Sequence, residues 1–170
     1  MFEPNIIVAC THPGCEIYRA EINPATDEIT AGFVHGFATD HTDEELEVTE
    51  ADNMPHYVKD VGSAIAWASL LVDCFDDPHT REALVLWCED HHITDASDVD
   101  LVEFEIAYKG HFETFQGFAE ELIEETGMLD GVPDQVAWFF DYEAFASDLE
   151  NNYTVIESEI DSCVYVFGGA

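Results

Sequence analysis

The residues of this chain that could bind a metal ion lie in two short segments. The segment "CTHPGC" holds Cys10, His12 and Cys15, and "DHH" places His91 beside His92. Thiolates and imidazoles are the ligands that zinc prefers, but a structural zinc site needs four of them at suitable spacing. Three ligands in one loop leave the fourth unidentified, so the sequence predicts neither a metal centre nor a cofactor. A structural metal stays an alternative that metal analysis of the purified protein would test.

Carboxylates are abundant, but their arrangement does not predict catalysis. The chain has no Gly-rich phosphate loop and no nucleophile elbow, and no motif sets two carboxylates apart as acid and base. The acidic run "DEELEVTEAD", residues 43–52, lacks the central Gly that a calcium-binding hand requires. We therefore expect a protein that is not an enzyme.

The most unusual carboxylates belong to "FAEELIEETGMLDG", residues 118–131, whose apolar residues recur at helical spacing. Glu120 and Glu124 are four residues apart on the other face, as are Glu121 and Glu125. Like charges at this spacing repel by roughly 0.2–0.5 kcal/mol per pair. The segment contains no cation to offset the repulsion, so a partner would have to supply one.

Acidic residues dominate the whole chain of 170 residues. There are 38 Asp and Glu against four Lys and Arg, and the formal net charge is −34. Hydrophobic residues still make up 47% of the chain and aromatic residues 12%, which is enough apolar material to bury a core. We expect the chain to fold in spite of its self-repulsion, and we expect no direct binding to DNA, whose phosphates it would repel.

Targeting signals are not apparent in the sequence. The start "MFEPNIIVAC" has no basic n-region, and no later run approaches the roughly 18–20 apolar residues of a membrane span. Five cysteines, an odd number, fit reduced thiols better than disulfides. These features predict a cytoplasmic protein.

Two hypotheses explain the excess of acid. Carboxylates four apart on a helix rise about 6 Å along its axis, close to two steps of a DNA strand at about 3.4 Å each, so a row of them could occupy a basic DNA-binding groove. In the alternative, the carboxylates hold water and cations on a surface adapted to salt. The candidate partner-binding residues of the first hypothesis are Asp43, Glu44, Glu45, Glu47, Glu103, Glu105, Glu120, Glu121, Glu124, Glu125, Asp130 and Asp134.

Hydrophobic patterning predicts an α+β fold, arranged as an elongated chain of small modules. The predicted modules are a β-rich one (1–52), a helical one (53–105) and an α+β one (106–170), with acidic loops near 40–52 and 90–100. The predicted strands are "NIIVAC", "EIYRAEI", "ITAGFVHGF", "DVDLVEFEIAYKG", "YTVIE" and "CVYVF". The predicted helices are "VGSAIAWASLLVDCF", "DPHTREALVLWCED", the glutamate-rich segment, "PDQVAWFF" and "DYEAFASDLE".

Several local details accompany this prediction. Asp77 is expected to cap a helix that has Pro78 at its first position, and Gly127 to end the glutamate-rich helix. In "DVDLVEFEIAYKG", alternate apolar residues from Val102 to Tyr108 are expected on one face of a strand, with the two glutamates between them on the other.

The segment "FAEELIEETGMLDGVPDQVAWFFDYEAFASDLENNYTVIESEIDSCVYVF" resembles the C-terminal part of the ArdA antirestriction family. In that family an acidic "EE-hydrophobic-hydrophobic-EETG-LL" helix is followed by "IP", an aromatic "DYEAFARDLE" helix and a "VYVF"-like strand. Nearer the start, "IIVAC" and "AGFVHGFATD" are similar to the family's opening strand and its "AG-LHG-W-D" segment. The chain departs from the family at Phe37 and Ala38 in the aromatic region, in an extra stretch at 11–30, and in the poorly matching residues 53–100.

The resemblance implies an elongated, usually dimeric DNA mimic of phages or mobile elements, which acts in the host bacterial cytoplasm on type I restriction–modification enzymes. The antirestriction motif falls on Glu120, Glu121, Leu122, Glu124, Glu125, Thr126, Gly127, Leu129 and Pro133. Of these residues, only the glutamates are expected to contact the enzyme's DNA-binding groove. We expect a homodimer formed mainly by the C-terminal module, because "CVYVF" has the character of an exposed sheet edge that needs covering.

Overall fold

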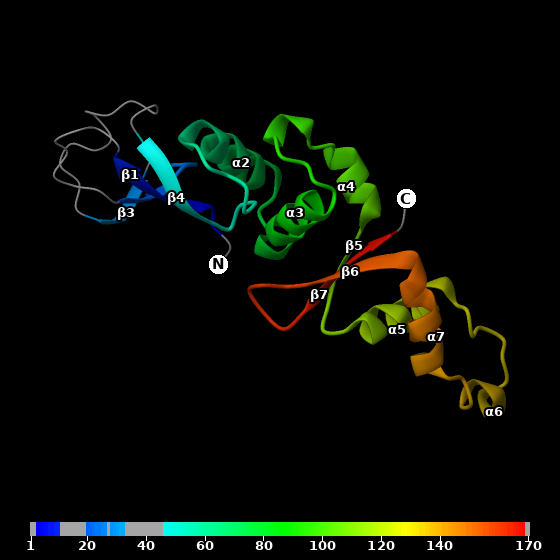
Figure 1. Cartoon of the computed structure of the whole chain (residues 1–170). Helices are drawn as coiled ribbons and strands as arrows, with labels where there is room; N and C mark the ends of the chain where they lie inside the picture. Colours follow the sequence, from blue (N-terminus) through cyan, green and yellow to red (C-terminus); the bar gives the residue numbers. More distant parts are fainter. Residues whose placement is uncertain (1–2, 11–19, 27, 33–45, 169–170) are drawn as a thin grey trace. The chain divides into compact units, whose positions relative to one another are not determined.

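The computed structural model describes residues 3–10, 20–26, 28–32 and 46–168. Contacts divide the chain into two compact units, Met1–Asp100 and Leu101–Ala170 (Figure 1). Each unit combines helices with one small antiparallel sheet, so the predicted α+β class is confirmed. The finer division into three modules, and their elongated arrangement, stay predictions.

The first unit opens with an antiparallel sheet in the order β3-β2-β1-β4. Its strands are β1 (Asn5–Cys10), β2 (Ala20–Asn23), β3 (Glu28–Gly32) and β4 (Leu46–Asp52). Ile6 and Val8 of β1 are buried and alternate with half-buried neighbours, as the two-residue period of a strand requires. The predicted strand "NIIVAC" is confirmed, and those at 16–22 and 29–37 are confirmed over the parts that the structure describes.

Strand β4 shows that the expected acidic loop near 40–52 is wrong for its last seven residues. These residues pair with β1, and Val48 lies buried opposite Val8. Leu46 and Val48 alternate with the exposed Glu47 and Thr49, which is a strand pattern that the density of carboxylates obscured. Residues 40–45 lie outside the described part of the chain.

Two packed helices complete the first unit, as predicted. They are α2 (Val61–Cys74) and α3 (Pro78–Asp90). The carboxylates of Asp60 and Asp77 cap them, accepting hydrogen bonds from Ser63 N and Thr80 N, each at 2.8 Å. The apolar faces of the two helices bury the side chains of Trp67, Leu71, Leu84 and Trp87.

The predicted strand at 98–110 is wrong for its first part, which is helical. After a short 3-10 helix η2 (Ala96–Asp98), the chain forms α4 (Leu101–Ala107) and only then β5 (Tyr108–Phe112). The ring of Phe104 in α4 stacks on that of Tyr108, the first residue of β5, with centroids 5.4 Å apart. Val102 and Ile106, four residues apart, are 65% and 69% exposed, so the alternating pattern did not mark a buried face.

The sheet of the second unit has the order β5-β7-β6, with all pairs antiparallel. Strands β6 (Tyr153–Glu157) and β7 (Val164–Gly168) confirm the two predicted closing strands. However, β7 is the central strand, and its Tyr165, Val166 and Phe167 are buried. The expectation that "CVYVF" forms an exposed edge is therefore wrong, because both sides of this strand are already paired.

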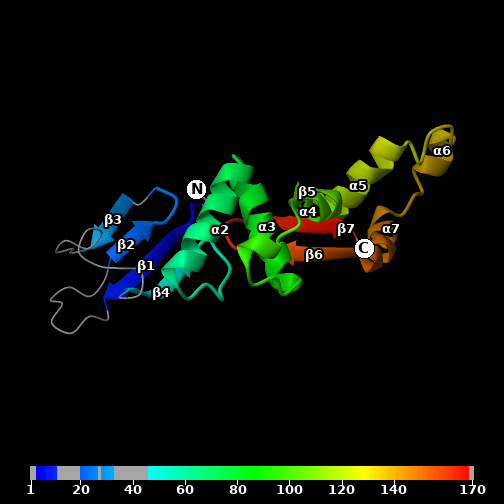
Figure 2. The same ribbon diagram turned by 90° about the horizontal axis from the view of Figure 1, so that it is seen from above.

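Three helices pack in the second unit with this sheet or extend from it. They are α5 (Phe115–Thr126), α6 (Asp134–Ala137) and α7 (Tyr142–Leu149), followed by a 3-10 turn η3 (Glu150–Asn152). Phe115, Phe118 and Ala119 of α5 join Ala146 of α7 and Val166 of β7 in one buried cluster. The predicted glutamate-rich helix and the helix at 141–150 are confirmed here, whereas the one predicted at 133–140 is helical only over Asp134–Ala137. Figure 2 shows α5 and α7 beside the sheet, with α6 drawn away from it.

Gly127 ends α5 in the left-handed conformation, with φ at 62°. Its N–H donates to Glu124 O at 3.2 Å, and Met128 N donates to Ile123 O at 3.1 Å. This closing pattern is the one predicted for the residue, since only Gly adopts a positive φ without a Cβ penalty. A Cβ at this position would also lie 2.6 Å from Asp130 Oδ2.

Two glycines of α5 are expected to respond to Ala in opposite directions. Gly127→Ala should lower the free energy of unfolding by about 1 kcal/mol, because Ala is strained at positive φ. Gly117→Ala should raise it by roughly 0.5–1 kcal/mol, since its Cβ would meet Thr114 Oγ1 only at an ordinary 3.7 Å. Urea denaturation followed by circular dichroism checks both values, and equal signs for the two variants would contradict the described end of the helix.

Candidate partner-binding surface

Helix α5 fixes four glutamates on its solvent-facing side. Thr114 begins the helix by accepting a hydrogen bond from Gly117 N at 3.2 Å, and the apolar side is anchored in the core. Glu120, Glu121, Glu124 and Glu125 are all exposed. The burial of one face thus forces the like-charged residues together on the other.

No basic side chain of the second unit lies within ion-pair range of these glutamates among the described residues. The sequence of that unit contains one Lys and no Arg, and the Nζ of this residue, Lys109, donates to Ile106 O at 2.6 Å. Among the described residues, the side-chain hydrogen bond to the four glutamates comes from Gln116 Nε2 to Glu120 Oε1, at 2.7 Å. Among the described residues of its own unit, α5 therefore has no Lys or Arg that offsets the charge of these four glutamates.

The Lys and Arg side chains that the structure describes all bind backbone carbonyls. Lys59, Arg81 and Lys109 each donate a hydrogen bond to a backbone carbonyl, at 3.1, 2.7 and 2.6 Å respectively. Two of these carbonyls, those of Phe75 and Ile106, lie at the C-terminal ends of α2 and α4, where a positive charge is favoured by the helix dipole. These three cations therefore make hydrogen bonds to helix ends and loops. Arg81 also forms an ion pair with Glu3, with 3.8 Å between its Nη1 and Glu3 Oε1.

The structure brings only part of the predicted residue set together. Asp130 follows α5 in a turn, where its N–H donates to Gly127 O at 2.9 Å and its exposed side chain lies close to Gly127 at the end of the helix. Asp134 is the exposed first residue of α6. Glu103 and Glu105 are exposed on α4, a different helix, and Glu47 is exposed on β4 in the first unit.

Three predicted carboxylates, Asp43, Glu44 and Glu45, lie outside the described residues. The same holds for the side chains of Cys10, His12 and Cys15, so the loop considered for zinc is not described. His91 lies at the end of α3, where its Nδ1 is 2.9 Å from Trp87 O and its ring lies over the indole at 4.4 Å. His92 follows with a positive φ of 57°.

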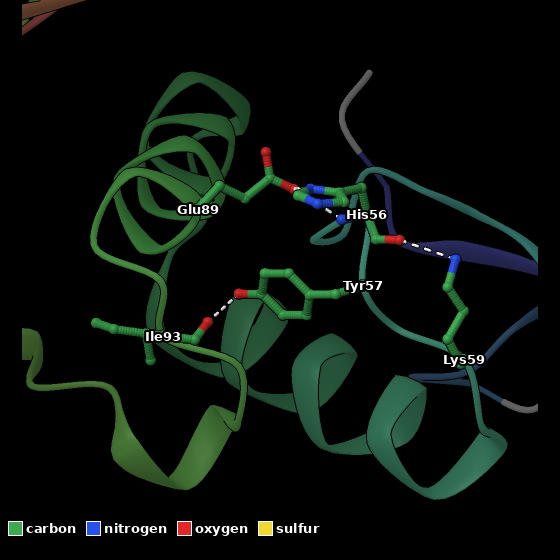
Figure 3. Close-up of polar contacts among 5 residues, drawn as sticks. All are labelled: His56, Tyr57, Lys59, Glu89 and Ile93. Atoms are coloured by element: carbon green, nitrogen blue, oxygen red, sulfur yellow. Dashed lines mark hydrogen bonds and ion pairs between the residues drawn. The ribbon is translucent and has the colours of Figure 1, made fainter.

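One polar cluster in the first unit uses titratable groups to join a loop to α3 (Figure 3). Glu89 Oε1 accepts from His56 N at 2.7 Å and lies 2.7 Å from His56 Nδ1. The Tyr57 hydroxyl donates to Ile93 O. Burial raises the pKa of Tyr57, and the negative charges of the Cys88 thiolate and the Glu89 carboxylate would raise that pKa further.

Burial, with a smaller effect of Glu89, likewise raises the pKa of Cys88 to about 12. The Cys88 thiol is therefore protonated at neutral pH, and the protonated form of a thiol is not the nucleophile. The cluster joins the loop at His56 to α3. Its carboxylate, that of Glu89, makes hydrogen bonds within the first unit, unlike the glutamates of α5 that lack a cation.

The sequence prediction missed one feature of the second unit. Trp138 and Phe139 belong to the predicted helix "PDQVAWFF", but they follow α6 directly and are 81% and 87% exposed. The segment "AWFF" contained a signal, because consecutive residues of a helix point about 100° apart, and three consecutive aromatic side chains cannot all face one core. Of the three, Phe140 packs inward, with ring centroids 4.9 Å from Tyr142 and 5.6 Å from Phe145.

A comparison with protein families decides the relationship of the chain. The family model for the antirestriction protein ArdA matches residues 15–162. The chain belongs to the ArdA antirestriction family. The match includes the acidic helix α5 and also residues 53–100, where the resemblance of the sequence to ArdA was weak. No curated protein matches the chain.

Membership of the ArdA family assigns an antirestriction role, which is that of an inhibitor protein. Within the described residues, no helix has the length and apolarity that crossing a bilayer would require. The family thus sets the class of function, while the surface of α5 supplies the chemistry from which a mechanism is inferred.

Proposed function

We propose that this ArdA family protein inhibits a type I restriction–modification enzyme by occupying the enzyme's DNA-binding groove as a mimic of DNA. The observation that carries the proposal is the exposed acidic side of α5, where four glutamates lack a cation from their own unit. Their spacing of about 6 Å along the helix axis approximates two phosphate steps of a DNA strand. The missing cations are then the Lys and Arg residues of the enzyme.

The energetics are compatible with this mechanism. Repulsion within α5 costs roughly 0.2–0.5 kcal/mol per pair, which is small beside a typical domain stability of about 5–15 kcal/mol. A basic groove gains affinity for an acidic partner through charge neutralisation, and this gain falls with salt. An acidic surface that served only for adaptation to salt would have no preference for a DNA-binding protein. The proposed enzyme lies in the bacterial cytoplasm, where the protein would act.

We expect the protein to displace DNA from the enzyme without binding DNA itself. Its net charge of −34 prevents association with a duplex, while the shared groove requires competition. The measurement is fluorescence anisotropy of a labelled duplex carrying the recognition site, with and without the purified methyltransferase core, over a range of salt concentrations. Direct, tight binding of the duplex by the protein alone would refute the mechanism, and so would failure to displace DNA at any salt concentration.

We also propose a homodimer formed by the second unit. Because β7 is paired on both sides, the contact would have to use the outer strands β5 and β6 or the helices instead. Two subunits of charge −34 repel, so association should tighten as salt screens them. Light scattering at low and high salt tests this expectation, and a monomer at every salt and protein concentration would exclude the dimer.

A further inference from the structure

Trp138 and Phe139 have the largest exposed fractions among the large apolar side chains that the structure describes. Their backbone is fixed, because Trp138 N donates to Asp134 O at 3.1 Å and Phe139 N donates to Val136 O at 3.0 Å. Figures 1 and 2 both draw α6 away from the sheet of its own unit. The two rings are therefore held outward by ordered backbone and are not part of the core.

The neighbouring residues show that the core of the unit is complete without this pair. Phe140, the next residue, packs on Tyr142 and Phe145, and Phe145 in turn lies against the buried cluster. No ring contact to Trp138 or Phe139 is present among the described residues. Exposed aromatic groups of this kind, rimmed by polar residues, mark contact sites on soluble proteins.

The residues that flank this aromatic pair along the chain, here called its rim, include three exposed carboxylates. Asp134 opens α6, Asp141 follows Phe140 and caps α7 by accepting from Ala144 N at 2.9 Å, and Glu143 lies two residues further on. A second copy of the chain would bring the same acidic rim, and like charges would face each other across the contact. A partner with Lys and Arg around an apolar surface matches both the rings and their rim.

We propose that Trp138 and Phe139 are an aromatic anchor that takes the place of nucleobases when the protein lies in the groove of a DNA-binding enzyme. The inference rests on the proposed function. Proteins that handle DNA combine basic residues with apolar or aromatic surfaces on which bases stack, and methyltransferases take an extruded base into a pocket. Carboxylates that take the positions of the phosphates would leave the enzyme's base-binding surface empty. The two adjacent exposed rings of Trp138 and Phe139 would fill that surface.

The anchor and the acidic helix contribute differently to binding, which makes them separable. Removing the rings changes no charge, so it should weaken binding at every salt concentration and leave the salt dependence unchanged. A buried aromatic anchor is typically among the residues whose truncation weakens an interface by about tenfold or more. Both rings are exposed in the free protein, so the fold should tolerate their loss.

The test is displacement of a labelled duplex with its recognition site from a purified type I methyltransferase core, at low and high salt. The variant Trp138→Ala/Phe139→Ala should need about tenfold or more of the protein for half-displacement at both salts. Trp138→Phe should retain most of the inhibition, because the ring survives. The matched control is Val102→Ala/Ile106→Ala, which removes exposed apolar side chains from α4 of the same unit and should change half-displacement less than about twofold.

Three outcomes would overturn the anchor. The double aromatic variant could displace DNA as well as the unchanged protein does, or the α4 control could lose as much as the aromatic variant. Light scattering could instead show a monomeric aromatic variant beside a dimeric unchanged protein, which would place the pair in contact with a second copy. Failure of the unchanged protein to displace DNA would reject the proposed function itself, a result distinct from all three.

Discussion

Changing Glu120, Glu121, Glu124 and Glu125 together to Gln is expected to weaken binding of the restriction enzyme by about 2–4 kcal/mol, the upper half of the range of about 0–4 kcal/mol that four exposed ion pairs of about 0–1 kcal/mol each can contribute. That loss corresponds to roughly a 30- to 1,000-fold change in affinity. Each single change, such as Glu124→Gln, should leave inhibition nearly intact. The quadruple variant should also show a flatter salt dependence, because fewer charges are neutralised on binding.

The same variant should be more stable as an isolated protein. Neutralising the four glutamates removes the like-charge pairs 120/124 and 121/125, worth roughly 0.2–0.5 kcal/mol each, while Gln at position 120 keeps an acceptor for Gln116. Inhibition should therefore fall while the stability of α5 rises. This opposition distinguishes a binding surface from a structural feature, whose loss would lower both.

The measurement is competition against labelled DNA for each single variant and for the quadruple variant, after circular dichroism has confirmed folding. A matched control replaces four other exposed acidic residues of the second unit by their amides: Asp148, Glu150, Glu157 and Glu159. The control changes the net charge equally, so an equal loss of affinity would assign the effect to total charge and not to α5. One folded single variant that loses all inhibition would refute a mechanism spread over many carboxylates.

Trp67→Ala is expected to cause the largest loss of stability, about 3–5 kcal/mol, as for other buried aromatic residues. Trp67 is fully buried in α2, and its ring meets that of Tyr57 edge-on with centroids 6.3 Å apart. A loss of this size is a large part of a typical stability of about 5–15 kcal/mol, and the self-repulsion of the chain adds to the risk of unfolding.

The matched variant is Trp67→Phe. The indole Nε1 of Trp67 is buried without a hydrogen-bond partner among the described residues, so Phe removes an unsatisfied donor while it keeps most of the ring. Its destabilisation should be clearly smaller than that of Ala. Urea denaturation followed by far-ultraviolet circular dichroism gives both values, and similar losses for Phe and Ala would show that the cavity is not the dominant cost.

Sequence patterns predicted most of the elements because many of their signals are local. The caps at Asp77 and Gly127 depend only on neighbouring residues, and both are as expected. The segment 101–107 misled the prediction because alternating Val, Glu, Phe, Glu and Ile has the period of a strand, while the buried contacts of Phe104 come from a helix. Strand β5 begins only at Tyr108, and where this boundary lies depends on how the whole second unit packs.

The candidate surface was likewise predictable where it depends on neighbouring residues, and not where it depends on residues far along the chain. The spacing of the glutamates predicted their common face on α5, and that part of the site could be found from the sequence. The position of "CVYVF" between two other strands, and the outward direction of Trp138 and Phe139, depend on residues far along the chain. Patterning alone marks such residues as apolar but does not say which of them the core has room for.

The central position of β7 has a consequence for the synthesis of the protein on the ribosome. Strands β5 and β6 do not pair with each other and are joined only through β7, which ends at Gly168. Helix α5 is complete at Thr126, yet its buried Phe115 and Phe118 pack in a cluster that includes Val166. The acidic helix therefore emerges from the exit tunnel before β7 can cover its apolar side, and we expect that side to stay accessible to chaperones until β7 has also left the tunnel.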